Sequence, residues 1–459
     1  MRVPLLVVAV AVLCCARVLP AEDAAAGGWK AGVTSVKVTP DGPAWMAGYA
    51  ARDKPSEGVE QDLFAKSLVL QDPAGETLVV VTLDLISVPG PLRKFVEQQL
   101  AESRGLKPKN LVMNCSHTHC GPEIRTTGSA LEGLDPERRA QSITYVQTLQ
   151  QRIVSSIDSA FENLAPARLA FQKARAAFAM NRRLPTDRGY SNSPNPDGRV
   201  DHDVPVLRVE TADKKLKAIV FGYACHNTTL GFYQMCGDYA GYAQEYLEAA
   251  HPGTVALFMM GCGGDQNPYP RRTLELAKQH GQTLATAVDA ALDTPQREIT
   301  GSLKLAFGTA DLEYADAPKK AELLEQAKST NKYDSRYAER LLKELDQGTL
   351  LTSYPAPVQA ARIGDQILFV ALPGETVVDY SLRIKNENRK SNGPDVWVAG
   401  YSNDVFAYIP SLRVLLEGGY EAGGAMRYMT TVVQPGPFAP NVEDILMRRV
   451  DELIKETSE

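Results

Sequence analysis

Two histidines stand one residue apart in the motif NCSHTHCGP at residues 114–122, in a chain that contains only six histidines. The motif follows a short apolar run at residues 110–114, which predicts a β-strand that delivers it. Residues i and i+2 of an extended chain share a face, so both His117 and His119 can point into one pocket. That arrangement suits two metal ligands, or one ligand beside a catalytic base. The alternative is a pair of histidines satisfied by hydrogen bonds in the core.

A third histidine and a carboxylate occupy comparable places. His226 ends the apolar run FGYAC, and Glu375 follows the sequence LPG where a helix running to about residue 386 is expected to open. Two imidazoles and a carboxylate are the protein ligands of many hydrolytic zinc sites, whose open position holds a water made acidic by the metal. For Glu375 taken alone, a helix-capping charge is the alternative.

Periodicity predicts the strands and helices that must bring these residues together. Residues 67–88 read as strand, turn and strand, and residues 92–104 as a helix stopped by Gly105. Further strands are expected at 167–171, 204–209, 218–224, 359–363, 366–371 and 396–400, and further helices at 136–163, 239–250 and 274–292. This mixture of hairpins and strand–helix steps predicts the α/β class, with a mixed β-sheet core and surrounding helices.

Two segments differ from this pattern. Residues 184–198 are rich in Pro, Gly and Asn, which predicts a loop that serves as a lid or an entrance wall. Residues 315–347 are rich in Lys, Glu, Leu and Ala, which predicts a peripheral, solvent-facing helical segment. Because no internal repeat is present, we expect a single catalytic domain over residues 22–459.

The first 21 residues predict a secretory signal peptide. Arg2 precedes a mostly apolar run at residues 4–15, and small residues end at Ala21 before acidic Glu22. A membrane anchor is the alternative, but the run falls short of the roughly 20 residues that span a bilayer. We therefore expect cleavage after Ala21 and export to the periplasm or the cell exterior.

Five cysteines remain after that cleavage, namely Cys115, Cys120, Cys225, Cys236 and Cys262. Because the number is odd, at least one lacks a partner within the chain, even where disulfides can form. Four of the five lie beside the candidate segments, so thiolate ligation of zinc is an alternative. The absence of any C-x-x-C pair disfavours it.

Charge and composition exclude some classes of function. The net charge is -6 and the pI is near 5.7, with no block of Lys and Arg anywhere. Nucleic acid is therefore excluded as a partner. Hydrophobic residues make up 44% of the chain and charged residues 23%, as in a globular protein with a large core.

From residue 33 to residue 426 the chain resembles the neutral, non-lysosomal ceramidases. The shared motifs are VKVTP at 36–40, MAGY at 46–49, DLFAK at 62–66, TLD at 82–84 and, most specifically, SHTHCGP at 116–122. The resemblance implies a zinc amidase that cleaves the N-acyl bond of ceramide to give sphingosine and a fatty acid. It also implies one catalytic zinc ion, whose four ligands are His117, His226, Glu375 and Tyr408.

The same resemblance assigns the remaining site residues. His119 becomes an unligated catalytic histidine. Arg182, with Arg183 as the fallback, and Tyr420 become the groups that receive the oxyanion. The alternatives are a surface salt bridge for the arginine and amphipathic packing for the two tyrosines. Supporting or structural roles, in orienting a histidine or a loop, fall to Asp265, Asp84 and Asn403.

The chain departs from the family at two points. Asn267 stands where the family has serine in the motif Gly-Asp-Val-Ser-Pro, so a nucleophilic serine there is impossible and attack by zinc-bound water is expected. The C-terminal immunoglobulin-like domain of typical ceramidases is expected to be absent. That absence and the altered loop at residues 181–203 put the lipid substrate in question more than the amide chemistry.

We therefore expect zinc-dependent hydrolysis of an N-acyl amide, with a ceramide-like amphiphile as the partner and a peripheral membrane contact. No protein partner is expected. One alternative keeps the chemistry but takes another N-acyl substrate, such as an acylated amino sugar or a lipoamino acid. The other is a non-catalytic binding protein on the same scaffold. A long apolar tunnel would favour lipid, and a short polar cleft would favour the first alternative.

Overall fold

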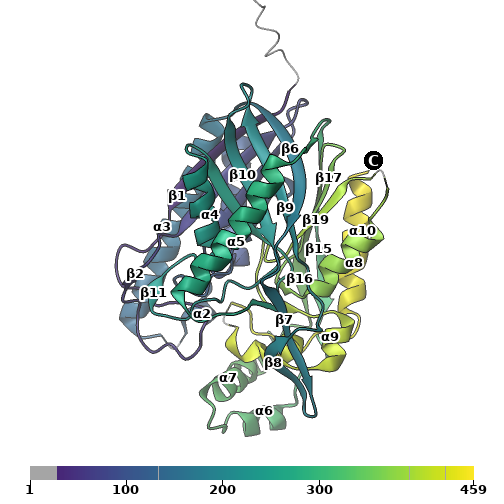
Figure 1. Cartoon of the computed structure of the whole chain (residues 1–459). Coiled ribbons are helices and arrows are strands. Elements are labelled where there is room, and N and C mark those ends of the chain that lie inside the picture. The colour runs from purple at the N-terminus through teal and green to yellow at the C-terminus, as the bar shows by residue number, and fades with distance from the viewer. Residues whose placement is uncertain (1–27, 133, 392, 430, 459) are drawn as a thin grey trace, which may run out of the picture.

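A nine-stranded mixed sheet forms the centre of the N-terminal half of the chain (Figure 1). The computed structural model describes residues 28–132, 134–391, 393–429 and 431–458, without the side chains of residues 128 and 129. The strand order is β12-β10-β9-β6-β1-β3-β4-β5, and β14 pairs with β6. Pairs β4–β5 and β10–β12 are parallel, which sets the carboxyl ends of each pair at one edge. The bounds are β1 (Lys30–Lys37), β3 (Phe64–Gln71), β4 (Thr77–Leu83), β5 (Leu111–Cys115), β6 (Ala165–Arg175), β9 (Asp203–Thr211), β10 (Leu216–Tyr223), β12 (Val255–Met260) and β14 (Arg297–Glu298).

A second sheet packs against the first, with helices on the two outer faces (Figure 1). Its strands are β15 (Leu303–Glu313), β16 (Ser353–Ile363), β17 (Ile367–Ala371) and β19 (Asp395–Ala399). The sheets meet through buried rings such as Phe171 and Trp397, whose centroids are 6.0 Å apart. The four layers bury apolar side chains on both faces of each sheet. The predicted α/β class, with a mixed sheet and surrounding helices, is confirmed.

The helices and short elements complete the fold. The helices are α1 (Gly90–Arg104), α2 (Gly128–Leu131), α3 (Pro136–Glu162), α4 (Asp238–Ala250), α5 (Leu274–Asp293), α6 (Lys320–Gln326), α7 (Lys332–Gln347), α8 (Val378–Glu387), α9 (Leu412–Glu417) and α10 (Val442–Glu456). The shorter elements are β2 (Gly58–Val59), η1 (Pro108–Asn110), β7 (Ala179–Thr186), β8 (Gly189–Asn195), β11 (Gln234–Met235), β13 (Gln266–Pro268), β18 (Glu375–Thr376), β20 (Tyr408–Ile409), η2 (Tyr420–Gly424) and η3 (Met426–Tyr428). None of these helices is both long enough and apolar enough to cross a membrane.

The predicted loop at residues 184–198 is wrong, because β7 and β8 form a hairpin there. Leu184 pairs with Ser191 and Thr186 with Gly189, and β7 also pairs with β13. Most of β8 is exposed or half-buried, so this edge strand needs no apolar residues and tolerates Pro194. The amino-acid composition of this exposed hairpin is therefore the same as that expected of a loop.

The predicted start of a helix at Glu375 is also wrong. Glu375 lies in β18, which pairs in parallel with β20, and α8 begins only at Val378. The register places Glu375 directly opposite Tyr408. This two-residue ladder, and not a helix end, sets the position of both side chains.

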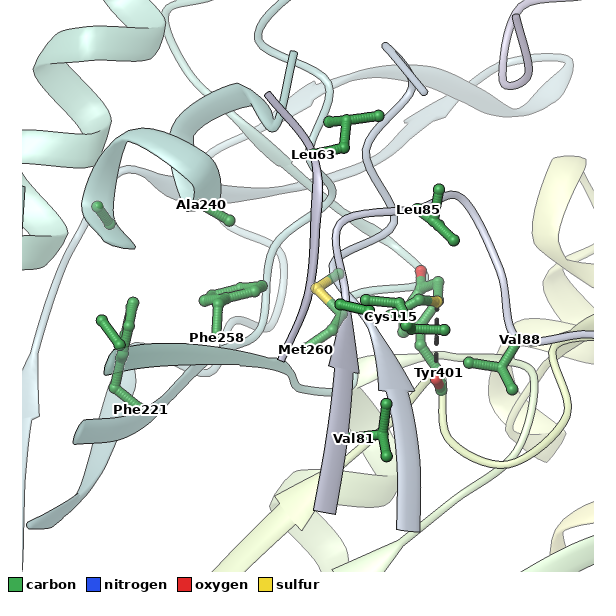
Figure 2. Close-up of a cluster of buried hydrophobic side chains, with 14 of the residues drawn as sticks. Leu63, Val81, Leu85, Val88, Cys115, Phe221, Ala240, Phe258, Met260 and Tyr401 are labelled. Carbon is green, nitrogen blue, oxygen red and sulfur yellow. Dashed lines mark hydrogen bonds between the residues drawn. The ribbon is translucent and has the colours of Figure 1, made fainter. Parts of the chain in front are cut away.

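Apolar packing fixes the loops that carry the candidate site. Figure 2 shows Cys115 and Tyr401 among Leu85, Val88 and Val81, with the Cys115 thiol 3.7 Å from the Tyr401 carbonyl oxygen. All five residues are at most 1% exposed. Because such a core is close-packed, the ends of β4, β5 and β19 have little freedom to move relative to one another.

The five cysteines of the described residues are buried free thiols, so none of these residues forms a disulfide. The cluster of metal-binding side chains found in the described part of the chain contains no cysteine. Thiolate ligation of a metal is therefore not supported. The predicted signal peptide, residues 1–21, lies outside the described residues.

Candidate metal centre

His117 leaves the end of β5 in a left-handed turn, with φ at 61°. A left-handed conformation is costly for a residue with a Cβ and is typically held by its surroundings. Here the backbone N–H donates to Leu85 O at 2.9 Å and Nδ1 lies 2.7 Å from Ile86 O. The expectation that the two histidines share a face of an extended strand is therefore wrong. The turn nevertheless brings Nε2 of His117 to 3.1 Å from Nε2 of His119.

His226 follows β10, which stands near the other end of the strand order from β5, and reaches the same point. Its Nδ1 lies 2.6 Å from Gly263 O, and the side chain is fully buried. Burial, together with the positive charge of Arg182, lowers the pKa of His226 to about 3. The imidazole is therefore neutral, as a metal ligand must be.

Glu375 and Tyr408 close the group from the two-stranded ladder of β18 and β20. Glu375 Oε2 lies 3.1 Å from His117 Nε2 and 3.2 Å from His226 Nε2, while Tyr408 Oη lies 3.2 Å from His226 Nε2. Burial alone would raise the pKa of Glu375, but the two imidazoles hold it well below its usual range. A carboxylate anion thus faces two imidazole nitrogens in a site from which water is largely excluded.

The chemistry of this donor set fits a zinc ion. Tetrahedral zinc with bonds near 2 Å separates its ligand atoms by roughly 3.3 Å, close to the spacing of these oxygen and nitrogen atoms. Both Nδ1 atoms of His117 and His226 face backbone carbonyls, which fixes the tautomer that leaves each Nε2 lone pair free for a metal. The four predicted ligands are therefore brought together with the orientation that ligation requires.

His119 differs from the other two histidines, although the three ligand nitrogens lie within 4.8 Å of one another. Its Nδ1 is buried and has no hydrogen-bond partner, so no carbonyl fixes its tautomer. Its ring packs edge-on against Tyr49 at 5.0 Å, and its side chain is half-buried where the other two are buried. Burial and the neighbouring imidazoles lower its pKa well below the ordinary value. The lowered pKa fits a neutral ligand as well as a base, but the free Nδ1 and the half-buried edge suit a proton carrier better than a ligand.

Arg182 and Tyr420 stand beside the donor set. Arg182 donates from Nη2 to Tyr408 Oη at 3.1 Å and from Nε to Glu421 Oε1 at 2.8 Å. Tyr420 packs edge-on against Tyr408 at 5.4 Å, and burial raises its pKa. Arg183 turns away and binds the other oxygen of Glu421 at 2.6 Å. Of the two arginines, only Arg182 therefore faces the candidate site.

The three predicted supporting residues orient loops and not histidines. Asp265 accepts from Asn181 Nδ2 at 3.0 Å and from the Val378 N–H at 2.8 Å, and so ties β7 to the start of α8. Asp84 accepts from the Phe64 N–H and from Gln244. Asn403, with φ at 66°, accepts from the Met113 N–H of β5.

Asp265→Asn should remove a pH-dependent part of the stability. Burial raises the pKa of Asp265 from 3.8 to about 6, so the folded chain holds this proton more tightly than the unfolded chain. The resulting stabilisation is present below pH ~4 and is lost as the pH rises through ~6, a difference of about 3 kcal/mol. In urea denaturation from pH 4 to 7, the free energy of unfolding of the wild type should fall relative to that of the variant. A difference that does not change with pH would contradict this assignment.

Two residues at the site were missed in the sequence. Tyr401 donates to Glu375 Oε2 at 3.3 Å and its ring lies 4.6 Å from that of His117. Glu421, only 3% exposed, holds both Arg182 and Arg183. Each of them is adjacent in sequence to a predicted motif, which could have indicated it: Tyr401 precedes the Ser-Asn pair and Glu421 follows Tyr420.

A small hollow, with room for about one water molecule, opens beside Tyr408 and Tyr420. Its apolar lining includes Met426, Met429 and Phe438. The predicted peripheral segment, residues 315–347, borders it, because Tyr337 of α7 donates to the carbonyl of the lining residue Gln434 at 2.7 Å.

Comparisons with known proteins agree with this geometry. The family described as "Neutral/alkaline non-lysosomal ceramidase, N-terminal" matches residues 29–268. A neutral ceramidase of Mycobacterium tuberculosis is 22% identical over 83% of this chain and 71% of its own length. Neutral ceramidase 2 of Arabidopsis thaliana is 25% identical over 59% of this chain, which spans 38% of that protein. The crystal structure of neutral ceramidase from Pseudomonas aeruginosa superposes with a TM-score of 0.73 at 18% identity, over 94% of this chain and 75% of that one.

Proposed function

The chain belongs to the neutral/alkaline non-lysosomal ceramidase family, a family of hydrolases, and on this premise we propose that it is a zinc-dependent amidase that cleaves a ceramide-like lipid. The products would be a sphingoid base and a fatty acid. The observation that carries the proposal is the convergence of four donor groups, in which both ligand histidines have their Nδ1 atoms held by carbonyls.

His119 is the group that moves protons. When bound, zinc supplies Lewis acidity that makes water nucleophilic near neutral pH. The neutral His119 imidazole accepts a proton from the attacking water and passes it to the leaving amine nitrogen. Its unpartnered Nδ1 supports this role, because no hydrogen bond locks it in one tautomer.

Arg182 and Tyr420 receive the negative charge that develops on the carbonyl oxygen. The Arg182 guanidinium is 4% exposed and is fixed by Glu421, so it needs little reorganisation as charge appears. Burial opposes its charge, but Tyr408 and Glu421 hold its pKa well above the ordinary value. The donor therefore stays cationic throughout the reaction.

Arg182→Met should lower kcat by about 10²- to 10³-fold, the usual cost of losing one oxyanion donor. Zinc content and fold should be retained, since Glu421 remains paired with Arg183. The measurement is amide hydrolysis under saturating substrate, with elemental analysis of zinc. The matched variant Arg183→Met should weaken stability more than kcat, and the opposite order would reverse the assignment of the two arginines.

The side chains around the small hollow beside Tyr420 would have to move apart to admit an acyl chain. The methionines of this lining and Phe438 offer adaptable apolar contacts at the place where the carbonyl would meet Arg182. Asn267 lies on the other side of Arg182 and accepts from Thr228 Oγ1 at 3.1 Å. An amide side chain cannot act as the serine of a covalent mechanism, which supports direct attack by water.

Metal removal tests the proposed function. Purified protein without residues 1–21 should contain one zinc per chain and should release fluorescent fatty acid from a short-chain ceramide. Chelation should abolish release, and added zinc should restore it. Zinc without ceramide cleavage would direct the search to other N-acyl substrates, and zinc without turnover of any amide would indicate a binding protein. Protein that never takes up zinc would refute the proposal.

A further inference from the structure

Three arginines and a tyrosine form a cationic rim beside His119, and we define this rim as Tyr49, Arg52, Arg271 and Arg272. The guanidinium carbons of Arg52 and Arg272 lie 5.0 and 5.5 Å from the centre of the Tyr49 ring. Arg272 Nη1 also donates to Tyr49 Oη at 3.2 Å. Since Tyr49 packs on His119 at 5.0 Å, the rim adjoins the half-buried edge of the candidate site.

No carboxylate of the described residues lies within ion-pair distance of the three rim arginines; the salt bridges nearest to the site go to Arg182 and Arg183. Arg52 donates to the backbone carbonyls of His119 and Phe232, and Arg271 contacts only the Tyr269 ring. The buried carboxylate of Asp238 is used by the N–H groups of Leu230 and Tyr239. The three rim arginines therefore have no ion-pair partner among the described residues.

The positive charge of the rim extends toward the reacting centre. Burial lowers the pKa of Arg271; Tyr269 opposes this shift, and the charges of Arg272 and, more weakly, Arg182 add to it. Arg271 thus experiences both the exposed Arg272 and the buried Arg182. An anion bound between the rim and the site would relieve that repulsion.

Arg272 is held in place by a strained backbone. Its φ is 97°, a region that favours glycine, and such a conformation costs about 1–3 kcal/mol unless its surroundings impose it. Its N–H donates to Thr229 O at 2.7 Å, and a Cβ on Gly231 would lie only 3.1 Å from Arg272 Nη1. The guanidinium is therefore pre-positioned between Tyr49 and the Gly231 backbone.

The proposed function places the leaving amine on this side of the site. His119 protonates the leaving nitrogen, and Tyr49 connects His119 to the rim. The apolar side chains beside Tyr408 and Tyr420 lie at the other end of the donor set, and the proposed function directs the acyl chain to that side. A group attached close to the amide nitrogen would therefore reach Arg271 and Arg272.

We infer that the preferred substrate carries an anionic group on its amine part, bound by Arg271 and Arg272. The planar forks of arginine suit a carboxylate, as in an N-acyl amino acid, or a phosphate on a sphingoid head group. An unmodified ceramide is neutral and leaves this charge unused. The inference rests on the proposed amidase function and names its substrate class.

The test compares matched amides on the zinc-loaded mature chain. N-lauroylglycine and N-lauroylethanolamine share the acyl chain and differ by a carboxylate against a hydroxymethyl group. We expect kcat/KM to be at least about tenfold higher for N-lauroylglycine, and to fall by about 10- to 100-fold in Arg271→Gln/Arg272→Gln. Turnover of N-lauroylethanolamine should fall by a clearly smaller factor in that variant, and zinc content should be retained. The control Arg389→Gln removes an exposed arginine at the end of α8 and should affect neither substrate.

A second pair of substrates, ceramide 1-phosphate and ceramide, identifies the source of the anion. If the ratio of kcat/KM for this pair exceeds the ratio for N-lauroylglycine over N-lauroylethanolamine, the anion is the phosphate of a lipid head group. Equal turnover of the charged and neutral partners, or equal losses for both in the double variant, would overturn the inference while leaving the amidase intact. Failure to cleave any of the four amides despite bound zinc would refute the proposed function itself, and the inference with it.

Discussion

Glu375→Gln is expected to remove zinc and amide hydrolysis together. Glu375 Oε2 is the atom common to both ligand histidines, at 3.1 and 3.2 Å, and it supplies the negative charge that a divalent cation requires in a buried site. A glutamine keeps the shape of the side chain but offers a neutral oxygen. Zinc should fall from one per chain to a small fraction after dialysis, and turnover should fall by a factor on the order of 10³ or more.

The fold should be retained, because Glu375 is 5% exposed and glutamine, which has the same shape, places no unpaired charge in that buried position. Circular dichroism and urea denaturation check that point. Glu443→Gln is the matched control, since Glu443 binds Arg383 and the Leu412 N–H on a distant helix and should retain both zinc and activity. A Glu375→Gln protein with full zinc content would show that another group, with His119 as the first candidate, completes the ligand set.

The histidines could be predicted from the sequence because they lie at the ends of buried, mostly apolar strands. β5 and β10 are buried over nearly their whole length, so their apolar runs are unbroken and the polar residues after them stand out. Their joint position does not follow from strand pairing, because β5 and β10 stand near opposite ends of the strand order, and the Asn114 side chain of β5 bonds the backbone of Met260 at the end of β12. The local path could not be predicted, because the left-handed turn at His117 depends on carbonyls of the β4–α1 loop.

The second half of the site could not be predicted from periodicity. Glu375 and Tyr408 meet through a ladder of two residues, which is too short to leave an alternating pattern. Tyr408 entered the ligand set only through resemblance to the family, and the structure adds the register that explains its position. The pairing of β18 with β20 depends on tertiary contacts, which the local sequence does not reveal.

The buried ion pairs beside the site could not be predicted from the sequence either. A surface salt bridge was the alternative for Arg182, and an ion pair is present, but both partners are at most 5% exposed. One carboxylate, Glu421, is shared between two arginines that are adjacent in sequence. Charge counts give no sign of such sharing, since paired and solvated glutamates look alike in a sequence. Only the fold reveals which of the two arginines faces the site.

His119→Gln should lower kcat by about 10²- to 10⁴-fold, the usual contribution of a general acid–base group. Glutamine can fill the space against Tyr49, but it cannot accept and return a proton near neutral pH. KM should change little, because the acyl chain and the oxyanion groups are untouched. His251→Gln is the matched control, since His251 pairs with Asp289 at the surface and should keep full activity.

Zinc content decides what a loss of turnover in His119→Gln means. One zinc per chain with low kcat would support the division of roles, in which His117 and His226 hold the metal and His119 moves protons. Zinc that falls in parallel with activity would make His119 a ligand, as the spacing of the three imidazoles also allows. The structural reason to expect the first result is the unpartnered Nδ1, because both other histidines have that atom fixed by a carbonyl and His119 does not. A ligand without such support would be an exception to the way proteins hold zinc.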